Sequence, residues 1–170
     1  MKSGLKLSAW IGFAILLAIL PASQTLAAPA SEPAEKERCP VCGMFVAKYP
    51  DWVTQVRLAD GKTLYFDGVK DLLVFHLDPA GYGGKREAIR ELWAKDYYTM
   101  EWLDLKSAWL VIGSDVYGPM GHEFIPFATR AAAENFRKDH HGTRILRLDE
   151  VTPPLVQSMR GGQKMMLPSR

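Results

Sequence analysis

Three sulfur-bearing side chains fall within six residues in the stretch Cys39–Met44 (CPVCGM). Thiolate and thioether sulfur together favour Cu(I), a soft ion that accepts few ligands. A second glycine-rich turn with a sulfur atom follows much later in the chain, at Gly118–His122 (GPMGH). If both turns serve one metal, the fold has to bring them together. We expect them to meet around a single copper ion.

The two turns offer five candidate ligands. Cys42 supplies a thiolate, Met44 and Met120 supply thioethers, and Cys39 or His122 completes the site. Methionine more often fills gaps in a core, but each of these methionines sits in a glycine turn, where a core-filling side chain is less expected. The ring of His122 is explained equally well as a histidine of a surface loop.

The pair Cys39 and Cys42 has three other interpretations. A thioredoxin-like pair follows a buried strand and opens a helix, but the preceding residues 35–38 (EKER) are all charged. A structural zinc site needs four ligands. The chain has only two cysteines, and the adjacent rings of His140 and His141 point in different directions rather than at one metal. A disulfide across so short a loop contributes only about 2 kcal/mol.

Residues 1–27 have the pattern of a cleavable signal peptide, because Lys2 and Lys6 precede an apolar run that is shorter than the roughly 20 residues of a membrane span. Residues 28–38 are polar and rich in proline, which predicts a disordered linker. No cysteine precedes Cys39, so no lipid anchor is visible. We therefore expect an exported, periplasmic protein.

The formal net charge is small. It is +2 for the whole chain, and loss of Lys2 and Lys6 with the signal peptide brings it to zero. A neutral domain lacks the basic surface that binding to nucleic acid requires. It also lacks a basic patch for anionic lipid.

The first half of the domain reads as a hairpin followed by a helix. Residues 52–59 and 62–66 alternate in polarity around Asp60-Gly61, a strong hairpin signal. Apolar residues then recur with a helical period from Val69 to His76. Asp67 is expected to cap this helix, and Asp71 is expected at an exposed position. Residues 85–94 are predicted to be helical and residues 97–103 to form a strand.

The second half repeats this order. Residues 108–112 and 124–127 are predicted strands on either side of the second sulfur turn, a helix follows through Phe136, and residues 143–148 read as a last strand. The predicted fold class is α+β, with two related small halves, each a β-hairpin plus a helix, packed as one domain over residues 39–150. Residues 151–170 are predicted to be a flexible tail.

Motifs for catalysis are absent from the sequence. No Ser-His-Asp spacing, phosphate loop or dinucleotide fingerprint occurs. Asp67 and Asp71 fit a cap and an exposed helix position better than a paired acid and base. We therefore predict that the protein is not an enzyme.

Several segments, taken in order, resemble the NosL family, the copper-binding accessory proteins of nitrous oxide reductase maturation. The resemblance runs from about Cys39 to Leu148. The segments that carry it are Cys39–Met44, Asp96–Asp104 (DYYTMEWLD), Ala108–Val111 (AWLV), Gly118–Gly121 (GPMG), Pro126-Phe127, Ala133–Phe136 and His141-Gly142.

The resemblance implies an α+β fold with two related halves similar to those of organomercurial lyase. It implies binding of one Cu(I), which passes to the membrane transporter complex that assembles the copper centres of the reductase. By position, the family's ligands correspond to Cys42, Met44 and Met120, whereas not all members have a cysteine at Cys39. Members are commonly lipoproteins, and the lack of an acylation site here puts the client in question.

We therefore predict an exported Cu(I) metallochaperone that works with a membrane copper-transporter or assembly complex and a client cuproenzyme, without nucleic acid or a small-molecule substrate. The alternative is a periplasmic thiol-disulfide oxidoreductase that uses Cys39 and Cys42. The two differ in their need for Met44 and Met120, for which redox chemistry has no use.

Overall fold

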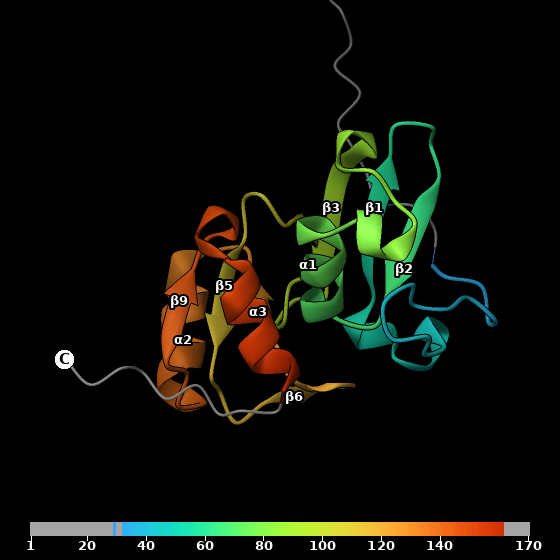
Figure 1. Cartoon of the computed structure of the whole chain (residues 1–170). Helices are drawn as coiled ribbons and strands as arrows, with labels where there is room; N and C mark the ends of the chain where they lie inside the picture. The colour runs from blue at the N-terminus through green and yellow to red at the C-terminus, as the bar shows by residue number, and fades with distance from the viewer. Residues whose placement is uncertain (1–28, 30–31, 162–170) are drawn as a thin grey trace, which may run out of the picture.

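The structure is a computed structural model that describes residues 29 and 32–161. The predicted signal peptide, residues 1–27, lies outside the described residues, as does the end of the predicted tail. Figure 1 shows two halves side by side, with two helices between them.

The first half is an antiparallel four-stranded sheet in the order β2-β1-β3-β4. Its strands are β1 (Thr54–Leu58), β2 (Thr63–Phe66), β3 (Ile89–Lys95) and β4 (Trp102–Asp104). The predicted hairpin between β1 and β2 is confirmed. Asp60 Oδ1 accepts the Lys62 N–H at 2.9 Å, and Gly61 adopts a φ of 85°, a conformation that glycine reaches without strain.

Helix α1 (Val69–Leu77) follows β2, as the apolar period predicts. Every residue from Val69 to Phe75 is buried, because the sheet covers one side of the helix and the second half covers the other. Short 3-10 turns connect the elements of this half: η1 (Val46–Lys48), η2 (Pro50–Trp52), η3 (Ala80–Tyr82) and η4 (Arg86–Ala88).

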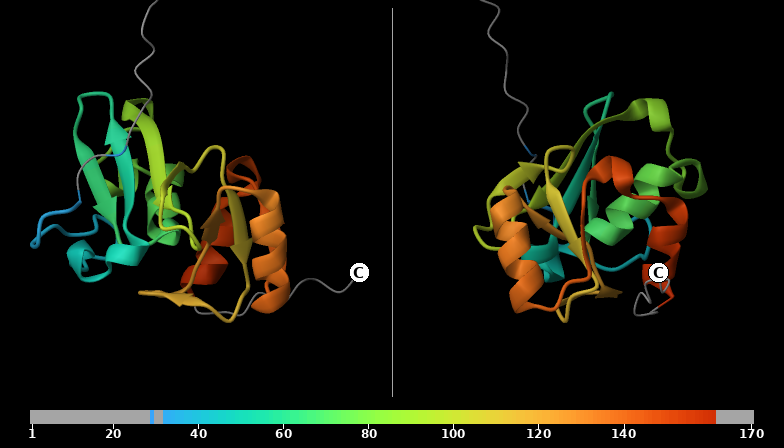
Figure 2. Two further views of the ribbon diagram at one scale, coloured as in Figure 1. Left: turned by 180° about the vertical axis from the view of Figure 1, so that it is seen from behind. Right: turned by 90° about the vertical axis from the view of Figure 1, so that its left-hand side faces the viewer.

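The second half is a three-stranded antiparallel sheet in the order β8-β5-β9, covered by α2 on its outer face (Figure 2). A separate two-stranded ribbon, β6–β7, lies between β5 and β8 in the sequence. The elements are β5 (Trp109–Ile112), β6 (Tyr117–Gly118), β7 (Gly121–His122), β8 (Ile125–Phe127), α2 (Arg130–Asp139), β9 (Arg144–Leu146), η5 (Leu148–Glu150) and α3 (Pro153–Arg160).

One hydrophobic core joins the two halves. Buried residues of α1, such as Leu72 and Leu73, belong to the same cluster as Ile112 and Phe124 of the second half. A smaller cluster, which includes Phe127 and Phe136, lies between α2 and its sheet. The expected packing of both halves as one α+β domain therefore holds.

Two predictions for the middle of the chain are wrong. Residues 85–94 do not form a helix, because η4 leads into β3, which pairs with β1 on one side and β4 on the other. The predicted strand over residues 97–103 begins only at Trp102. Asp96 Oδ1 accepts the N–H groups of Tyr98 and Thr99, at 2.9 and 3.0 Å, and so holds a turn there.

Both ends of the domain are also more structured than predicted. The predicted tail contains α3, which buries Val156 and Met159 against α1. The predicted linker contributes contacts as well, since Glu32 lies 3.1 Å from Lys95 Nζ and Arg38 pairs with Phe45 in an isolated β-bridge. No helix within the described residues is long and apolar enough to cross a membrane.

Candidate metal centre

The stretch Cys39–Met44 folds into a tight loop that its own backbone closes. The Met44 carbonyl accepts the Cys39 N–H at 2.9 Å, and the Cys39 carbonyl accepts the Gly43 N–H at 2.9 Å. Gly43 has a φ of 78°, in the left-handed region that favours glycine. The loop therefore holds its two cysteines close together, and both are free thiols.

The two thiols meet two carboxylates at the start of α1. Cys42 Sγ donates to Asp67 Oδ1 at 3.1 Å, and Cys39 Sγ donates to Asp71 Oδ2 at 3.5 Å. The four donor atoms lie within 4.8 Å of one another, a spacing that one metal ion can bridge. We call Cys39, Cys42, Asp67 and Asp71 the thiol–carboxylate cluster.

The two aspartates differ from their predicted roles. Asp67 is 1% exposed, and its side chain makes no capping bond, because Gly68 occupies the N-cap position of α1. Asp71 is 5% exposed rather than on an open face. Their spacing of four residues places Asp67 just before the helix and Asp71 in its first turn, and both face the cysteine loop. That spacing was the only signal in the sequence, and it does not reveal which partner buries them.

The environment of the cluster favours protonated thiols. Burial raises the pKa of the Cys39 thiol to about 12, and the negative charges of Asp67 and Asp71 add to the shift. Burial also raises the pKa of Cys42, and its hydrogen bond to Asp67 stabilises the protonated form further. A metal that binds here as a thiolate complex must therefore displace protons.

Burial also removes both carboxylates from contact with water. Burial raises the pKa of Asp71, while the hydrogen bonds from both thiols act in the opposite direction. Asp67 Oδ2 is buried and has no hydrogen-bond partner among the described residues. A cation bound by the two thiols would offset the charge beside this oxygen, since an unpaired buried polar atom is costly.

The β6–β7 ribbon is fastened to the same helix start. Lys70, which precedes Asp71, donates from Nζ to the carbonyls of Met120 at 2.6 Å and His122 at 2.7 Å. In return, Glu123 Oε1 accepts the backbone N–H of Lys70 at 2.5 Å. Figures 1 and 2 show the ribbon projecting from the second half toward the first.

Glycines make room for this junction. A Cβ on Gly68 would collide with Glu123 Oε2, and a Cβ on Gly118 would lie 3.2 Å from the same atom. Glu123 is only 3% exposed, and burial raises its pKa to about 8, although the N–H groups of Phe124 and Lys70 and the Lys70 charge act in the opposite direction. The second sulfur turn is therefore glycine-rich partly because a carboxyl group passes beside it.

The structure places the five predicted ligands in two groups. Cys39 and Cys42 lie within the cluster, and Met44 ends the same loop, half-buried. Met120 and His122 lie on the ribbon, where Met120 is 47% exposed and the His122 ring packs on Tyr117 at a centroid distance of 4.9 Å. The first turn of α1 contacts both groups, through Asp71 on one side and Lys70 on the other.

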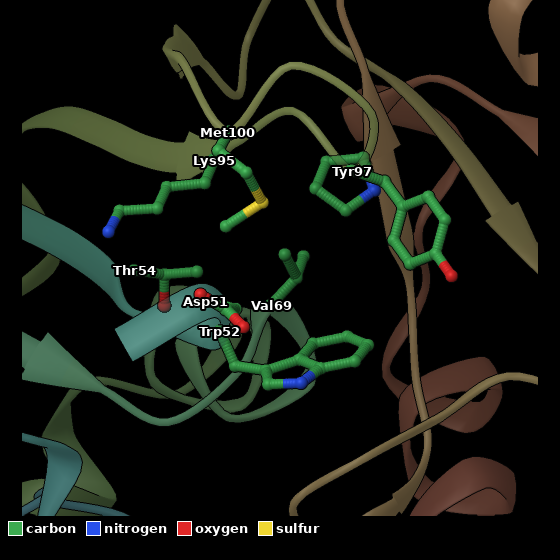
Figure 3. A pocket seen from close by; sticks show the side chains of 8 residues that line it. Asp51, Trp52, Thr54, Val69, Lys95, Tyr97 and Met100 are labelled. Carbon is green, nitrogen blue, oxygen red and sulfur yellow. The ribbon is translucent and has the colours of Figure 1, made fainter. Parts of the chain in front are cut away.

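A separate cavity of about 250 Å³ opens between the two halves (Figure 3). Trp52 forms one wall and the Met100 side chain faces it from above. The ammonium of Lys95 is already engaged, 2.9 Å from the Pro50 carbonyl. The cavity is lined by no thiol and by none of the five predicted ligands. Its lining residues are Asp51, Trp52, Thr54, Val69, Lys95, Tyr97, Met100 and Pro126.

Comparisons with known proteins agree with this architecture. The NosL family model matches residues 29–156. The crystal structure of the copper chaperone NosL from Shewanella denitrificans is similar to this chain, with a TM-score of 0.65 and 25% identity over 74% of this chain and 97% of that one. No curated protein matches.

The solution NMR structure of the apo-NosL protein from Achromobacter cycloclastes is also similar, with a TM-score of 0.46 and 24% identity over 61% of this chain and 87% of that one. The family match and the Shewanella structure confirm the predicted resemblance and the α+β fold. They relate the chain to a chaperone and not to an enzyme, as predicted.

Proposed function

Since the chain belongs to the NosL family, whose model matches residues 29–156, we propose that it is an exported Cu(I)-binding metallochaperone that delivers copper for the assembly of a cuproenzyme. One observation carries the proposal. Two free thiols lie together at the start of α1, and the same helix turn fastens the ribbon that bears Met120.

Sulfur supplies the copper ligands. Cys42 provides thiolate, Met44 and Met120 provide thioether, and Cys39 or His122 completes the coordination. Asp67 and Asp71 are hard oxygen donors, which suit Cu(I) less well than sulfur does. We therefore leave the carboxylates out of the Cu(I) ligand set and assign them the role of hydrogen-bond acceptors for the thiols in the metal-free protein.

The exposure of the ligands suits transfer to a partner. Cys39 is buried, Cys42 is half-buried and Met120 is about half exposed, so that the site opens toward solvent on the methionine side. A ligand of a second protein can approach copper from that side and replace the thioether first. Stepwise exchange of this kind lets copper pass between proteins without being released.

We place this transfer in the periplasm, with a membrane copper-transporter or assembly complex as partner and nitrous oxide reductase as client. The signal-peptide pattern of residues 1–27 supports export, and the family resemblance supports the client. Fractionation of cells that make the full chain tests the location, and recovery of the protein only from the cytosol would overturn it.

Anaerobic titration of the reduced protein with Cu(I), against a chelator of known affinity, tests the function. We expect one Cu(I) per chain, and Cys42→Ser and Met120→Leu should each weaken binding by roughly tenfold or more, because each removes one soft donor. Met100→Leu is the matched control, since that methionine is also exposed and lines the separate cavity, which contains none of the five predicted ligands. Unchanged affinity in both site variants would contradict the proposal.

The alternative, a thiol-disulfide oxidoreductase, is disfavoured by the environment of the thiols. A nucleophilic cysteine needs a lowered pKa, commonly from a helix N-terminus or a nearby cation. Here burial and the adjacent carboxylates raise the pKa of both Cys39 and Cys42. The cysteines also lie in a loop and do not open a helix.

A further inference from the structure

We infer that Lys70 and Glu123 are positioning residues that hold the Met120 thioether at the copper site, an inference that rests on the proposed function. Neither side chain belongs to the predicted ligand set. Together they make the hydrogen bonds that join the ribbon to the start of α1.

The bonds run in both directions across the junction. Lys70 Nζ donates to the carbonyls on either side of Gly121, those of Met120 and His122, at 2.6 and 2.7 Å. Glu123 Oε1 accepts the backbone N–H of Lys70 at 2.5 Å and that of Phe124 at 2.8 Å. The Lys70 side chain therefore fixes the backbone of the ribbon around Gly121, and the Glu123 side chain fixes the backbone of Lys70 at the start of α1.

Burial makes these bonds specific. Lys70 is 2% exposed and Glu123 is 3% exposed, so water does not compete for their polar atoms. A buried ammonium or carboxyl group without partners is costly. The ribbon is therefore stable only in the position against α1 where both groups find their hydrogen-bond partners. The glycines at positions 68 and 118 leave the space in which the Glu123 side chain lies.

The junction also links the two groups of ligands. Lys70 lies between residues of the same helix turn that hold the thiols, because Asp67 accepts from Cys42 and Asp71 accepts from Cys39. The backbone of Met120 is thus set relative to the thiols through a single turn of α1. Loss of the Lys70 ammonium removes both bonds to the ribbon loop and leaves the thiol–carboxylate cluster intact.

A double-mutant cycle tests the inference. Cu(I) affinity is measured by chelator competition for the wild-type protein, Lys70→Leu, Met120→Leu and the double variant. We expect Lys70→Leu alone to weaken binding by roughly tenfold, about as much as Met120→Leu, and Met120→Leu to have little further effect in the Lys70→Leu background, since coupled residues do not act additively.

Lys106→Leu is the matched control, because Lys106 Nζ also donates to a carbonyl, that of Arg90 at 2.9 Å, at an exposed place outside the site. It should keep the wild-type affinity. If Lys70→Leu does not fold, Glu123→Leu removes the other half of the junction and should show the same non-additivity. A far-ultraviolet circular dichroism spectrum confirms that each variant assayed is folded.

The outcomes separate the inference from the proposed function. If Met120→Leu weakens binding equally in the wild-type and Lys70→Leu backgrounds, the positioning role is overturned while the ligand assignment stands. If Met120→Leu has no effect in the wild-type protein, the ligand assignment itself fails, and the inference fails with it.

Discussion

The pH dependence of Cu(I) binding follows directly from the surroundings of the two thiols. Burial and the nearby carboxylates hold the Cys39 pKa at about 12 and raise that of Cys42 as well. Both thiols are therefore protonated throughout the neutral range. Each thiolate that binds copper must first lose its proton, so the apparent affinity rises with pH.

The change in apparent Cu(I) affinity per pH unit reports how many thiolates bind copper. Far below the pKa, each displaced proton changes the apparent affinity by about tenfold per pH unit, so two bound thiolates predict about 100-fold per unit. Cys39→Ser removes one of them and should reduce the dependence to about tenfold per unit. Asp71→Asn should preserve the two-proton dependence. Asp71 is not a copper ligand, so its replacement leaves both thiol protons to be displaced by copper.

Competition against a Cu(I) chelator, repeated from about pH 6.5 to about pH 7.5 and corrected for protonation of the chelator, measures this dependence. A tenfold dependence in both the wild-type protein and Cys39→Ser would remove Cys39 from the ligand set. An affinity independent of pH would show that neither Cys39 nor Cys42 loses a proton when copper binds, and would exclude both as thiolate ligands.

Two further predictions concern the fold. The pKa of Glu123 rises from 4.5 to about 8 on folding, so the folded state keeps a proton that the unfolded state has lost, and stability should fall as the pH rises between these values. Glu123→Gln should flatten this dependence in urea unfolding, and an unchanged slope would show that Glu123 is not its source. Thr129 Oγ1 caps α2 by accepting the Ala132 N–H at 3.2 Å, so Thr129→Ala should cost about 1 kcal/mol of stability. Thr129→Ser keeps the cap and is the control, and equal losses in both variants would exclude a capping role.

Local signals in the sequence were sufficient where the structure depends on neighbouring residues. The Asp60-Gly61 turn fixes the β1–β2 hairpin, and the apolar period after Val69 predicts α1. For residues 85–94, local signals predicted the wrong structure. Ile89, Leu92 and Trp93 fit a helical face over so short a window, but the segment becomes β3 because β1 and β4 provide partners on both sides.

The site was predictable only in part, for a related reason. Sulfur in glycine turns identified Cys39 and Cys42, because their chemistry is visible in the residues themselves. Asp67 and Asp71 look like ordinary helix-start residues until the cysteine loop covers them. Lys70 and Glu123 are still less visible, since charged residues are rarely buried and only the seated ribbon supplies their partners.

X-ray absorption at the copper edge, measured on the reduced, Cu(I)-loaded protein and on Met120→Leu, shows whether the Met120 thioether and the cysteine thiolates bind the same copper ion. We predict a copper ion bound mainly by sulfur, with one sulfur ligand fewer in Met120→Leu, because the cysteine loop and the ribbon share one ion. A first shell of nitrogen and oxygen only, or identical spectra for the two proteins, would contradict it.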